Sequence, residues 1–530
     1  MTPDWHYAAQ RSAVSPYSPL RTRIAGRQIA LFDNGDTVFA CNNLCPHEGY
    51  PLSEGSLSGR CILTCNWHNW KFDLQDGANL YGGDRLTTYP VALRDEEIWI
   101  DLSDPPVAER RARCIESLED AFADAAYDRI AREIARLVRL DSDPLQAARL
   151  AIHWSWQRME FGWTHAYAGM ADWLTLYSEF AGDPELQLVC LVESVAHAAD
   201  DTLREKTYPF EEGSRPYDEE GFLEAIEAED ESGAIAMIRG GLATGLGFGD
   251  FERGFARAAL AHYLDFGHAL IYVTKMRQLD ALLGQDVLEP LLLSLTRSLV
   301  FATREDRIPE FRHYATALTA WGKSAGDSKP SAVNWRGKGI RSSLALVIDS
   351  AASPAALLHR ELLLANAWNL LHFDLKVEDK VSVSVSGNVG WLDFTHGITF
   401  ASAVREQCTR FPELWPSGLL QMACFQGRNA AFTSEQDVSR WMTKDNDSAL
   451  SHAIDQVINH SQGEYIVSVH LLKTTLAVRQ EADALDSDVS LLVAALNRFL
   501  GSPLRRRRPR RTAWQSLRFV AREYGEVAED

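Results

Sequence analysis

The stretch "CPHEGYPLSEGSLSGRCILTCNWH" covers Cys45–His68 and carries two short clusters, each with one cysteine and one histidine. The first cluster contains Cys45 and His47, and the second contains Cys65 and His68. Clustered thiolates and imidazoles are typical ligands of zinc or of iron–sulfur centres. The stretch therefore predicts a metal centre built from two short loops.

The mirrored order of ligands narrows the kind of centre. Structural zinc sites usually use arms with two cysteines or two histidines each. Here each arm offers one sulfur and one nitrogen, which suits a [2Fe-2S] cluster whose irons carry two cysteines and two histidines respectively. This pattern favours a Rieske-type cluster over zinc. Its predicted ligands are Cys45, His47, Cys65 and His68.

Two further segments resemble known Rieske proteins. "CNWHNWKFDLQDG" (residues 65–77) resembles the second arm of Rieske ferredoxins and ring-hydroxylating oxygenases. "TTYPVALRDEEIWIDL" (residues 87–102) resembles the segment that ends those domains. The resemblance covers roughly residues 1–104 and implies a soluble, ferredoxin-type domain. We expect Cys41 and Cys61 to be small buried residues rather than a disulfide.

The hydrophobic pattern divides the chain. Residues 27–43 alternate apolar and polar side chains around the turn pair Asn34-Gly35, which predicts a β-hairpin. "SDPPVAERRAR" (residues 103–113) reads as a linker, and apolar residues then recur at helical spacing to about Leu500. We predict a multi-domain protein with a small all-β Rieske domain followed by a large all-α domain. The expected segments are 1–104 for the Rieske domain, 105–113 for the linker, 114–500 for the helical domain and 501–530 for a basic, mobile tail.

Composition excludes several classes of protein. The chain has 530 residues, 46% of them apolar, and a formal net charge of −20. A chain this acidic does not favour nucleic-acid binding, which needs a basic face. The sequence shows no long uncharged apolar run and no signal-peptide pattern, and eight cysteines fit a reducing compartment. We expect a cytoplasmic protein without membrane or nucleic-acid partners.

The helical region must explain what the cluster serves, because a Rieske cluster has no open coordination position. His470 and Lys473 are three residues apart, so on a helix they share one face. Buried, a lysine can become neutral and add carbon dioxide to form a carboxylate-like ligand. An amphipathic helix with a surface lysine explains the same pair without a metal.

Four segments resemble the questin oxidase-like family of all-helical non-haem iron oxygenases. They are "FGWTHAYAGMADWLTLYSEFAGDPELQ" (161–187), "AALAHYLDFGHALIY" (258–272), "DFTHGITFASAVREQ" (393–407) and "HLLKTTLAVRQE" (470–481). The resemblance implies one Fe(II) ion held by four histidines and a carboxylated lysine. Carried over, the set is His165, His262, His396, His470 and Lys473. His262 and His268 lie about 240° apart on a regular helix, so only one can face the ion, and we choose His262.

These features together predict an oxidoreductase that uses dioxygen. An external reductase or ferredoxin would supply electrons, and the substrate would be a small organic molecule, aromatic or polycyclic. Two alternatives stay open. One is a carboxylate-bridged di-iron site that includes Glu193 and His197, which lie one helical turn apart. The other is a non-enzymatic electron-transfer or redox-sensing protein.

Overall fold

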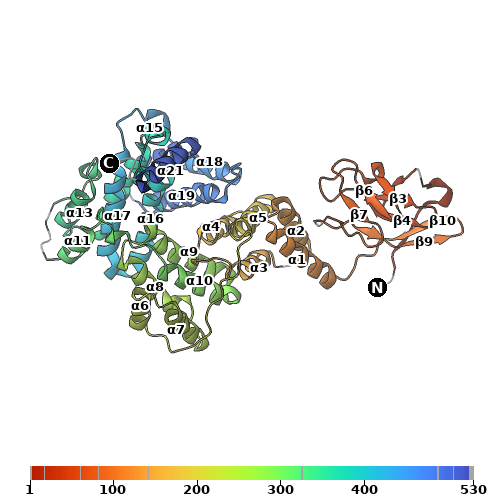
Figure 1. Ribbon diagram of the computed structural model, residues 1–530, viewed down its shortest axis with the longest axis horizontal. Helices are drawn as coiled ribbons and strands as arrows, with labels where there is room; N and C mark the ends of the chain where they lie inside the picture. Colours follow the sequence, from red (N-terminus) through yellow and green to blue (C-terminus); the bar gives the residue numbers. More distant parts are fainter. Residues whose placement is uncertain are drawn as a thin grey trace. The chain divides into compact units, whose positions relative to one another are not determined.

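The chain forms two compact units, Met1–Pro144 and Leu145–Asp530, in a computed structural model. The structure describes all residues except 1–2, 17, 60, 82, 141–142, 324–325, 327, 486–488, 505–506 and 525–530. Figure 1 colours the strands of the first unit red to orange and the helices of the second unit yellow to blue. The expected order, a small all-β domain followed by a large helical domain, is confirmed.

Ten strands make up the β-domain. They are β1 (Trp5–Gln10), β2 (Leu20–Ile24), β3 (Arg27–Asp33), β4 (Val38–Asn42), β5 (Ser56–Ser58), β6 (Ile62–Thr64), β7 (Lys71–Asp73), β8 (Thr88–Tyr89), β9 (Val91–Arg94) and β10 (Glu97–Asp101). They form three sheets with strand orders β1-β10-β9, β2-β3-β4-β8 and β5-β6-β7, and all pairs are antiparallel. The hairpin predicted around Asn34-Gly35 is β3–β4, with Asp33 paired to Val38.

Strand β3 separates two hydrophobic cores, because successive side chains of a strand point to opposite faces. Ile29 and Leu31 pack in a core with β1 and β10. Ala30 and Phe32 pack in the other core, which also contains Cys45 and Cys65. The loops that carry the predicted cluster ligands are therefore anchored in a dry core. Cys41 and Cys61 are buried and free of disulfides.

The predicted linker is a helix instead. Helix α1 (Val107–Ala123) begins directly after Pro106, and α2 (Tyr127–Arg139) follows. Both helices belong to the first unit, together with the β-domain. Helix α2 joins the first unit because tertiary ion pairs connect it to the β-domain. The buried carboxylate of Asp84 accepts hydrogen bonds from Arg132 at 2.5 Å and from Arg136 at 2.9 Å. The unit boundary therefore lies near residue 144.

The second unit is helical. Its α-helices are α3 (Gln146–Ser155), α4 (His165–Glu179), α5 (Pro184–Asp201), α6 (Glu219–Glu227), α7 (Glu231–Ala243), α8 (Phe248–Ala261), α9 (His268–Leu283), α10 (Leu288–Val300), α11 (Tyr314–Ala320), α12 (Ala332–Trp335), α13 (Ile340–Asp349), α14 (Ala355–Leu371), α15 (Leu375–Asp379), α16 (Trp391–Arg410), α17 (Trp415–Asn429), α18 (Asn446–Ile458), α19 (Tyr465–Ala484), α20 (Ser490–Leu500) and α21 (Pro509–Glu523). Among the described helices, none combines the length and apolar character needed to cross a bilayer.

Four of these helices form a closed ring. Helix α4 packs against α9, α9 against α16, α16 against α19, and α19 against α4. Their side chains are buried on nearly all sides, which explains why their sequences show weak amphipathic patterns. The ring is the core in which the helical-domain histidines lie.

The C-terminal segment was expected to be mobile, but its described part is docked. Helix α21 is held by Arg511, a buried residue that donates hydrogen bonds to the carbonyls of Val377, Glu378 and Lys380. The arginine run looked self-repelling in the sequence. These carbonyls at the end of α15 give Arg511 partners that outweigh the repulsion. Residues 505–506 and 525–530 lie outside the described part.

Candidate metal centres

The two ligand arms of the β-domain have the same backbone structure. In the first, the Cys45 amide donates to the Tyr50 carbonyl at 2.8 Å, and the Gly49 amide donates to the Cys45 carbonyl at 2.8 Å. In the second, Cys65 donates to Trp70 at 2.8 Å, and Asn69 donates to Cys65 at 2.9 Å. Gly49 and Asn69, at equivalent places, are both left-handed, with φ of 76° and 61°.

The arms also pack against each other with approximate two-fold symmetry. Tyr50 stacks on Trp67 with ring centroids 4.1 Å apart, and His47 stacks on Trp70 at 4.5 Å. In the first pair, Trp67 lies two residues after Cys65, and Tyr50 lies five residues after Cys45. In the second pair, His47 lies two residues after Cys45, and Trp70 lies five residues after Cys65. The imidazoles of His47 and His68 face each other edge to face at 4.8 Å. The arms therefore place their ligands as two matched halves of one site.

The donor set fits a [2Fe-2S] cluster. Cys45 and Cys65 are buried, and burial followed by the nearby Cys65 thiol raises the pKa of the Cys45 thiol to about 11. The metal-free protein therefore favours the thiol form, and the positive charge of a bound cluster would stabilise both sulfurs as thiolates. His47 Nδ1 is buried and has no hydrogen-bond partner among the described residues, as expected of a nitrogen reserved for a metal. His47 is partly buried and His68 is exposed, so the site lies at the surface of the domain.

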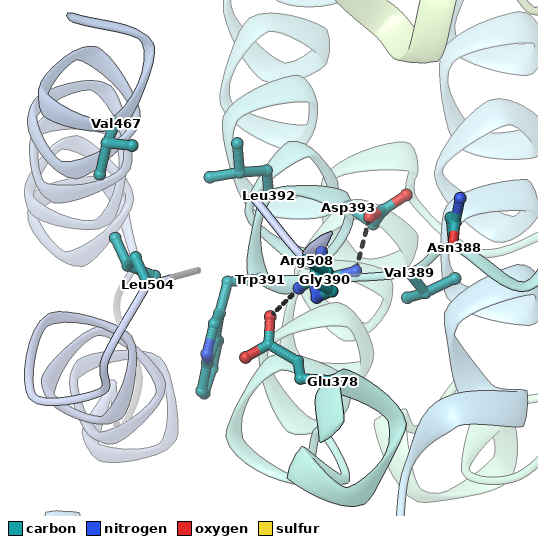
Figure 2. Close-up of a pocket in the computed structure, with 10 residues that line it drawn as sticks. All are labelled: Glu378, Asn388, Val389, Gly390, Trp391, Leu392, Asp393, Val467, Leu504 and Arg508. Carbon is teal, nitrogen blue, oxygen red and sulfur yellow. Dashed lines mark hydrogen bonds and ion pairs between the residues drawn. The ribbon is translucent and has the colours of Figure 1, made fainter. Parts of the chain in front are cut away.

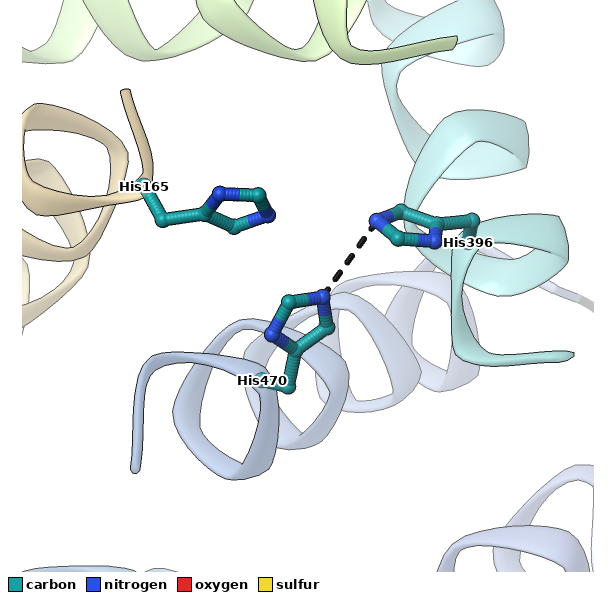
Figure 3. Close-up of side chains that lie close together, drawn as sticks. All are labelled: His165, His396 and His470. Carbon is teal, nitrogen blue, oxygen red and sulfur yellow. Dashed lines mark hydrogen bonds between the residues drawn. The ribbon is translucent and has the colours of Figure 1, made fainter. Parts of the chain in front are cut away.

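A second group of histidines converges inside the ring of α4, α9, α16 and α19. The Nε2 atoms of His165 and His268 lie 3.0 Å apart, and those of His396 and His470 lie 3.3 Å apart. His396 Nε2 is 3.2 Å from the Nζ atom of Lys473. Figure 3 shows His165, His396 and His470 pointing toward one another from three helices. The structure brings His165, His396, His470 and Lys473 together, as the resemblance implied.

Two of these imidazoles have fixed orientations. His268 Nδ1 donates to the Asp265 carbonyl at 2.5 Å, and His470 Nδ1 donates to the Ile466 carbonyl at 2.6 Å. The proton on Nδ1 leaves a lone pair on each Nε2, aimed at the centre of the cluster. Each of these lone pairs can accept a hydrogen bond from a neighbouring imidazole or bind a metal ion. The donor set fits a metal ion held by Nε2 atoms, with His268 and His470 each fixed by a hydrogen bond on the far nitrogen.

Burial favours the neutral forms of the His268, His396 and Lys473 side chains. Burial, followed by the charge of Lys473, lowers the pKa of His268 to about 3 and holds the pKa of His396 well below its usual range. Burial lowers the pKa of Lys473 to about 7, although Asp172 opposes this change. Neutral imidazole is the form that binds metals. The Lys473 amine is partly neutral near pH 7.

The expected ligand His262 lies outside this cluster, and His268 takes its place. His262 caps the end of α8 and pairs with Asp306 and Glu227, each at 2.9 Å. The choice of His262 assumed one regular helix. The chain instead passes through three left-handed residues, Asp265, Phe266 and Gly267, before α9 begins at His268. The glycine directly before His268 is the one sequence signal of this break.

Glu193 and His197, the pair considered for a di-iron site, form a separate buried network. Glu193 Oε2 accepts from His197 at 2.9 Å and from His460 at 3.0 Å. His197 also bonds the Ser468 hydroxyl at 3.1 Å. Both residues are buried. The Glu193 oxygen thus joins α5 to the loop before α19, and His197 joins α5 to α19.

A cavity of about 120 Å³ opens one helical turn from the histidine cluster. Leu392 precedes His396 by four residues, and Val467 precedes His470 by three; both line the cavity. His396 and His470 are not among the residues that line it. Figure 2 shows Leu392, Val467 and Leu504 around it, with Arg508 paired to Glu378. Its wall therefore includes two residues from the C-terminal segment.

Comparison with known proteins concerns the N-terminal domain. The Rieske [2Fe-2S] domain family matches residues 4–89. The ferredoxin component of the naphthalene 1,2-dioxygenase system of Pseudomonas putida is 32% identical over 105 residues, 19% of this chain and 100% of that protein. The ferredoxin subunit of the 3-phenylpropionate/cinnamic acid dioxygenase of Escherichia coli is 40% identical over 76 residues, 14% of this chain and 72% of that protein.

A larger relative matches over the same region. The 4beta-methylsterol monooxygenase of Methylococcus capsulatus is 32% identical over 117 residues, which cover 20% of this chain and 31% of that protein. The chain thus spans about a third of the monooxygenase but the whole of the naphthalene system ferredoxin. The similarity lies in the part that holds Cys45, His47, Cys65 and His68.

Proposed function

The chain belongs, through its N-terminal domain, to the Rieske [2Fe-2S] domain family, and on that premise we propose that it is an iron-dependent oxygenase. The β-domain holds a [2Fe-2S] cluster, which supplies one-electron transfer. In this proposal an external reductase or ferredoxin reduces the cluster. The helical unit holds one Fe(II) ion and uses dioxygen to oxidise an organic substrate, aromatic or polycyclic.

The observation that carries the proposal is the convergence of three buried imidazoles, one half-buried imidazole and one buried lysine from four different helices. The charged forms of these groups are costly to bury, so natural cores do not gather them without a ligand to compensate. The set agrees with the iron site implied by the questin oxidase-like resemblance, with His268 in place of His262. Iron at this position would supply the activation of dioxygen.

Lys473 completes the set in this proposal. It is 2% exposed, and its Nζ atom lies 3.2 Å from His396 Nε2. In its neutral form, the amine nitrogen can attack carbon dioxide, form a C–N bond and release one proton. The resulting carbamate is an anionic oxygen ligand, which balances the metal charge that four neutral imidazoles leave uncompensated. The buried Asp172–Lys275 pair lies near enough to influence the Lys473 pKa.

The cavity beside the cluster is the proposed substrate site. Leu392, Val467 and Leu504 offer an apolar surface, as aromatic ligands require. Arg508 and Glu378 provide polar groups at one end that can orient a substrate. On the other side of the cluster, the buried ring of Tyr272 lies 5.6 Å from the His268 ring and helps to exclude water.

Iron content tests the proposal against its alternatives. We expect about three iron atoms per chain, two in the cluster and one in the helical unit. His396→Ala combined with His470→Ala should lower the count to about two and abolish substrate-dependent dioxygen uptake, with the Rieske EPR signal intact. About four iron atoms in the unmodified protein would indicate a di-iron site. Two would leave an electron-transfer or redox-sensing protein.

A further inference from the structure

A small cavity lies next to Lys473 inside the ring of α4, α9, α16 and α19. It has a volume of about 20 Å³, which is room for one small molecule. Helix α9 contributes Thr274 and Lys275 to its wall, α16 contributes Thr399 and Ser402, and α19 contributes Lys473. Close-packed cores contain few voids of this size. This void lies against a proposed iron ligand, so its position bears on the chemistry of that ligand.

Along α19, the small cavity extends from the histidine layer toward the surface. Val467, which lines the cavity of about 120 Å³, precedes His470 by three residues. Lys473 and Gln480, which line the small cavity, follow His470 by three and ten residues. Ten residues of helix span roughly 15 Å. The two cavities thus lie on opposite sides of His470 along α19, and the proposed substrate does not occupy the small one.

A single hydrogen bond closes the outer end of the small cavity. The Ser402 hydroxyl donates to Gln480 Oε1 at 3.4 Å. This distance exceeds the range of about 2.5–3.0 Å that is usual between two oxygens, so the bond is weak. Ser402 is buried, whereas Gln480 is half-buried. Solvent is therefore separated from the cavity by a contact that breaks easily.

The wall of the cavity suits a neutral, electron-poor molecule. The Thr274 hydroxyl donates to the Leu270 carbonyl at 3.1 Å, and the Thr399 hydroxyl donates to the Thr395 carbonyl at 3.3 Å. Both hydrogens are used within their own helices, so the hydroxyl oxygens offer lone pairs to the cavity. Lone pairs attract the electron-poor carbon of carbon dioxide. Bicarbonate is an anion and would lose its hydration in this buried space, which is costly.

The two lysines of the cavity differ in their partners. Lys275 Nζ donates to Asp172 Oδ1 at 2.5 Å, and both residues are buried. Lys473 has no carboxylate within ion-pair distance among the described residues, and its Nζ atom lies 3.2 Å from His396 Nε2. A buried amine next to another cationic group is activated as a nucleophile. Lys473 is therefore the reactive amine of the pair, and Lys275 is the charged one.

We propose that this cavity is the passage through which carbon dioxide reaches Lys473 from solvent. The proposal rests on the carboxylated lysine of the proposed function and adds its supply route. Carbon dioxide enters between Ser402 and Gln480. Lys473 Nζ forms a C–N bond with its carbon atom, and the electron pair of one C–O π bond moves to the oxygen. The proton released from the nitrogen leaves through the same passage to solvent water.

Trapping of the carbamate in the intact, iron-loaded protein tests the passage. The protein is mixed with bicarbonate labelled with a heavy carbon isotope, which supplies labelled carbon dioxide, and triethyloxonium alkylates the carbamate at successive times. Mass spectrometry of the peptide that contains Lys473 then gives the labelled fraction. We expect Ala477→Leu, which fills the cavity from α19, to slow labelling roughly tenfold. Gln480→Ala removes the outer hydrogen bond and should speed labelling roughly threefold.

The opposite directions of these two effects separate the passage from damage to the fold, which would shift both rates in one direction. Ala484→Leu makes the same change at an exposed position of α19 and should leave the rate unchanged. Every variant should reach the wild-type labelled fraction after long incubation, because a passage controls the rate and not the end point. Equal rates in wild type and Ala477→Leu would overturn the passage while the carboxylated lysine stands. Absence of labelled carbamate from the wild-type protein would overturn both.

Discussion

The Nε2 atoms of His165 and His268 lie 3.0 Å apart although 103 residues separate them in the sequence. Each histidine is the first residue of its helix, α4 or α9. Their rings therefore meet because two helix N-termini meet. The position of a helix start is thus as important for this cluster as the residue type.

Iron binding should depend on His268 and not on His262. We expect His268→Ala to lose most of the non-cluster iron, at least the roughly 10–100-fold loss in affinity that changes behind a metal ligand produce. His262→Ala is the matched change. It removes two ion pairs, with Asp306 and Glu227, and should lower the melting temperature while iron is kept. Elemental analysis after gel filtration measures both. Iron loss in His262→Ala but not in His268→Ala would contradict the structure.

The first ligand arm should not tolerate a β-branched side chain at Gly49. Its φ of 76° is unfavourable for a β-branched residue by about 1–3 kcal/mol, and no neighbouring atom would block the new Cβ. We expect Gly49→Val to distort the arm and lower the cluster content, read from the visible absorption per chain. Gly59→Val places the same residue at φ 59° in the turn between β5 and β6. It should keep the cluster; equal losses in both variants would argue against a specific role of the arm.

The proposed cluster ligands of the β-domain could be predicted from the sequence because they are local. Cys45 and His68 lie within one short stretch, and the spacing of the ligands reflects the two loops directly. The proposed ligands of the helical domain come from distant parts of the sequence, so only a family resemblance predicted them. His268 was passed over because the left-handed residues 265–267 are invisible to an argument based on a regular helix. The overall order of a β-domain and a helical domain followed from periodicity alone.

Periodicity does not reveal which core a helix joins. The sequence of α1 and α2 is typical of a helical domain, but Asp84, more than 40 residues earlier, draws α2 to the β-domain. The same limit applies to α21. Its arginine run predicts a solvated segment, whereas Arg511 finds its carbonyl partners at residues 377–380. In both cases a single buried ion pair or hydrogen-bond set changes the assignment.

Stability of the iron-free protein should rise with pH through Lys473. The pKa of Lys473 is about 7 in the folded protein, against 10.5 ordinarily, because of burial. The unfolded chain therefore binds more protons between these values, and the free energy of unfolding increases from pH 7 toward pH 10.5. Lys473→Met should remove this slope and stabilise the iron-free protein at pH 7 by a few kcal/mol, on the order of 3. It should also lose iron.

Urea unfolding followed by circular dichroism at 222 nm, after treatment with a chelator, measures this slope at pH 7, 8 and 9. Lys444→Met, at an exposed position, is the control and should leave the slope unchanged. A Lys473→Met protein whose stability still rises over the same range would mean that another group titrates there.

Arg511 should determine whether the C-terminal segment stays docked. Its guanidinium satisfies three carbonyls of the α15 region, at 2.7 Å, 2.9 Å and 3.0 Å, in a buried position. Arg511→Met would leave these carbonyls unpaired, at a cost of about 2–4 kcal/mol, and release α21.

Leu504 and Arg508, which line the cavity beside the histidine cluster, belong to the same segment and should move with it. We expect faster trypsin cleavage after Arg507 and Arg510 and weaker binding of aromatic substrates. Arg510→Met removes an exposed arginine and one trypsin site from the same helix turn, so it separates docking from the loss of a cleavage site. Because Arg511 is the only residue in the described part of the chain whose side chain reaches these carbonyls, equal digestion of both variants would show that α21 is held by other contacts.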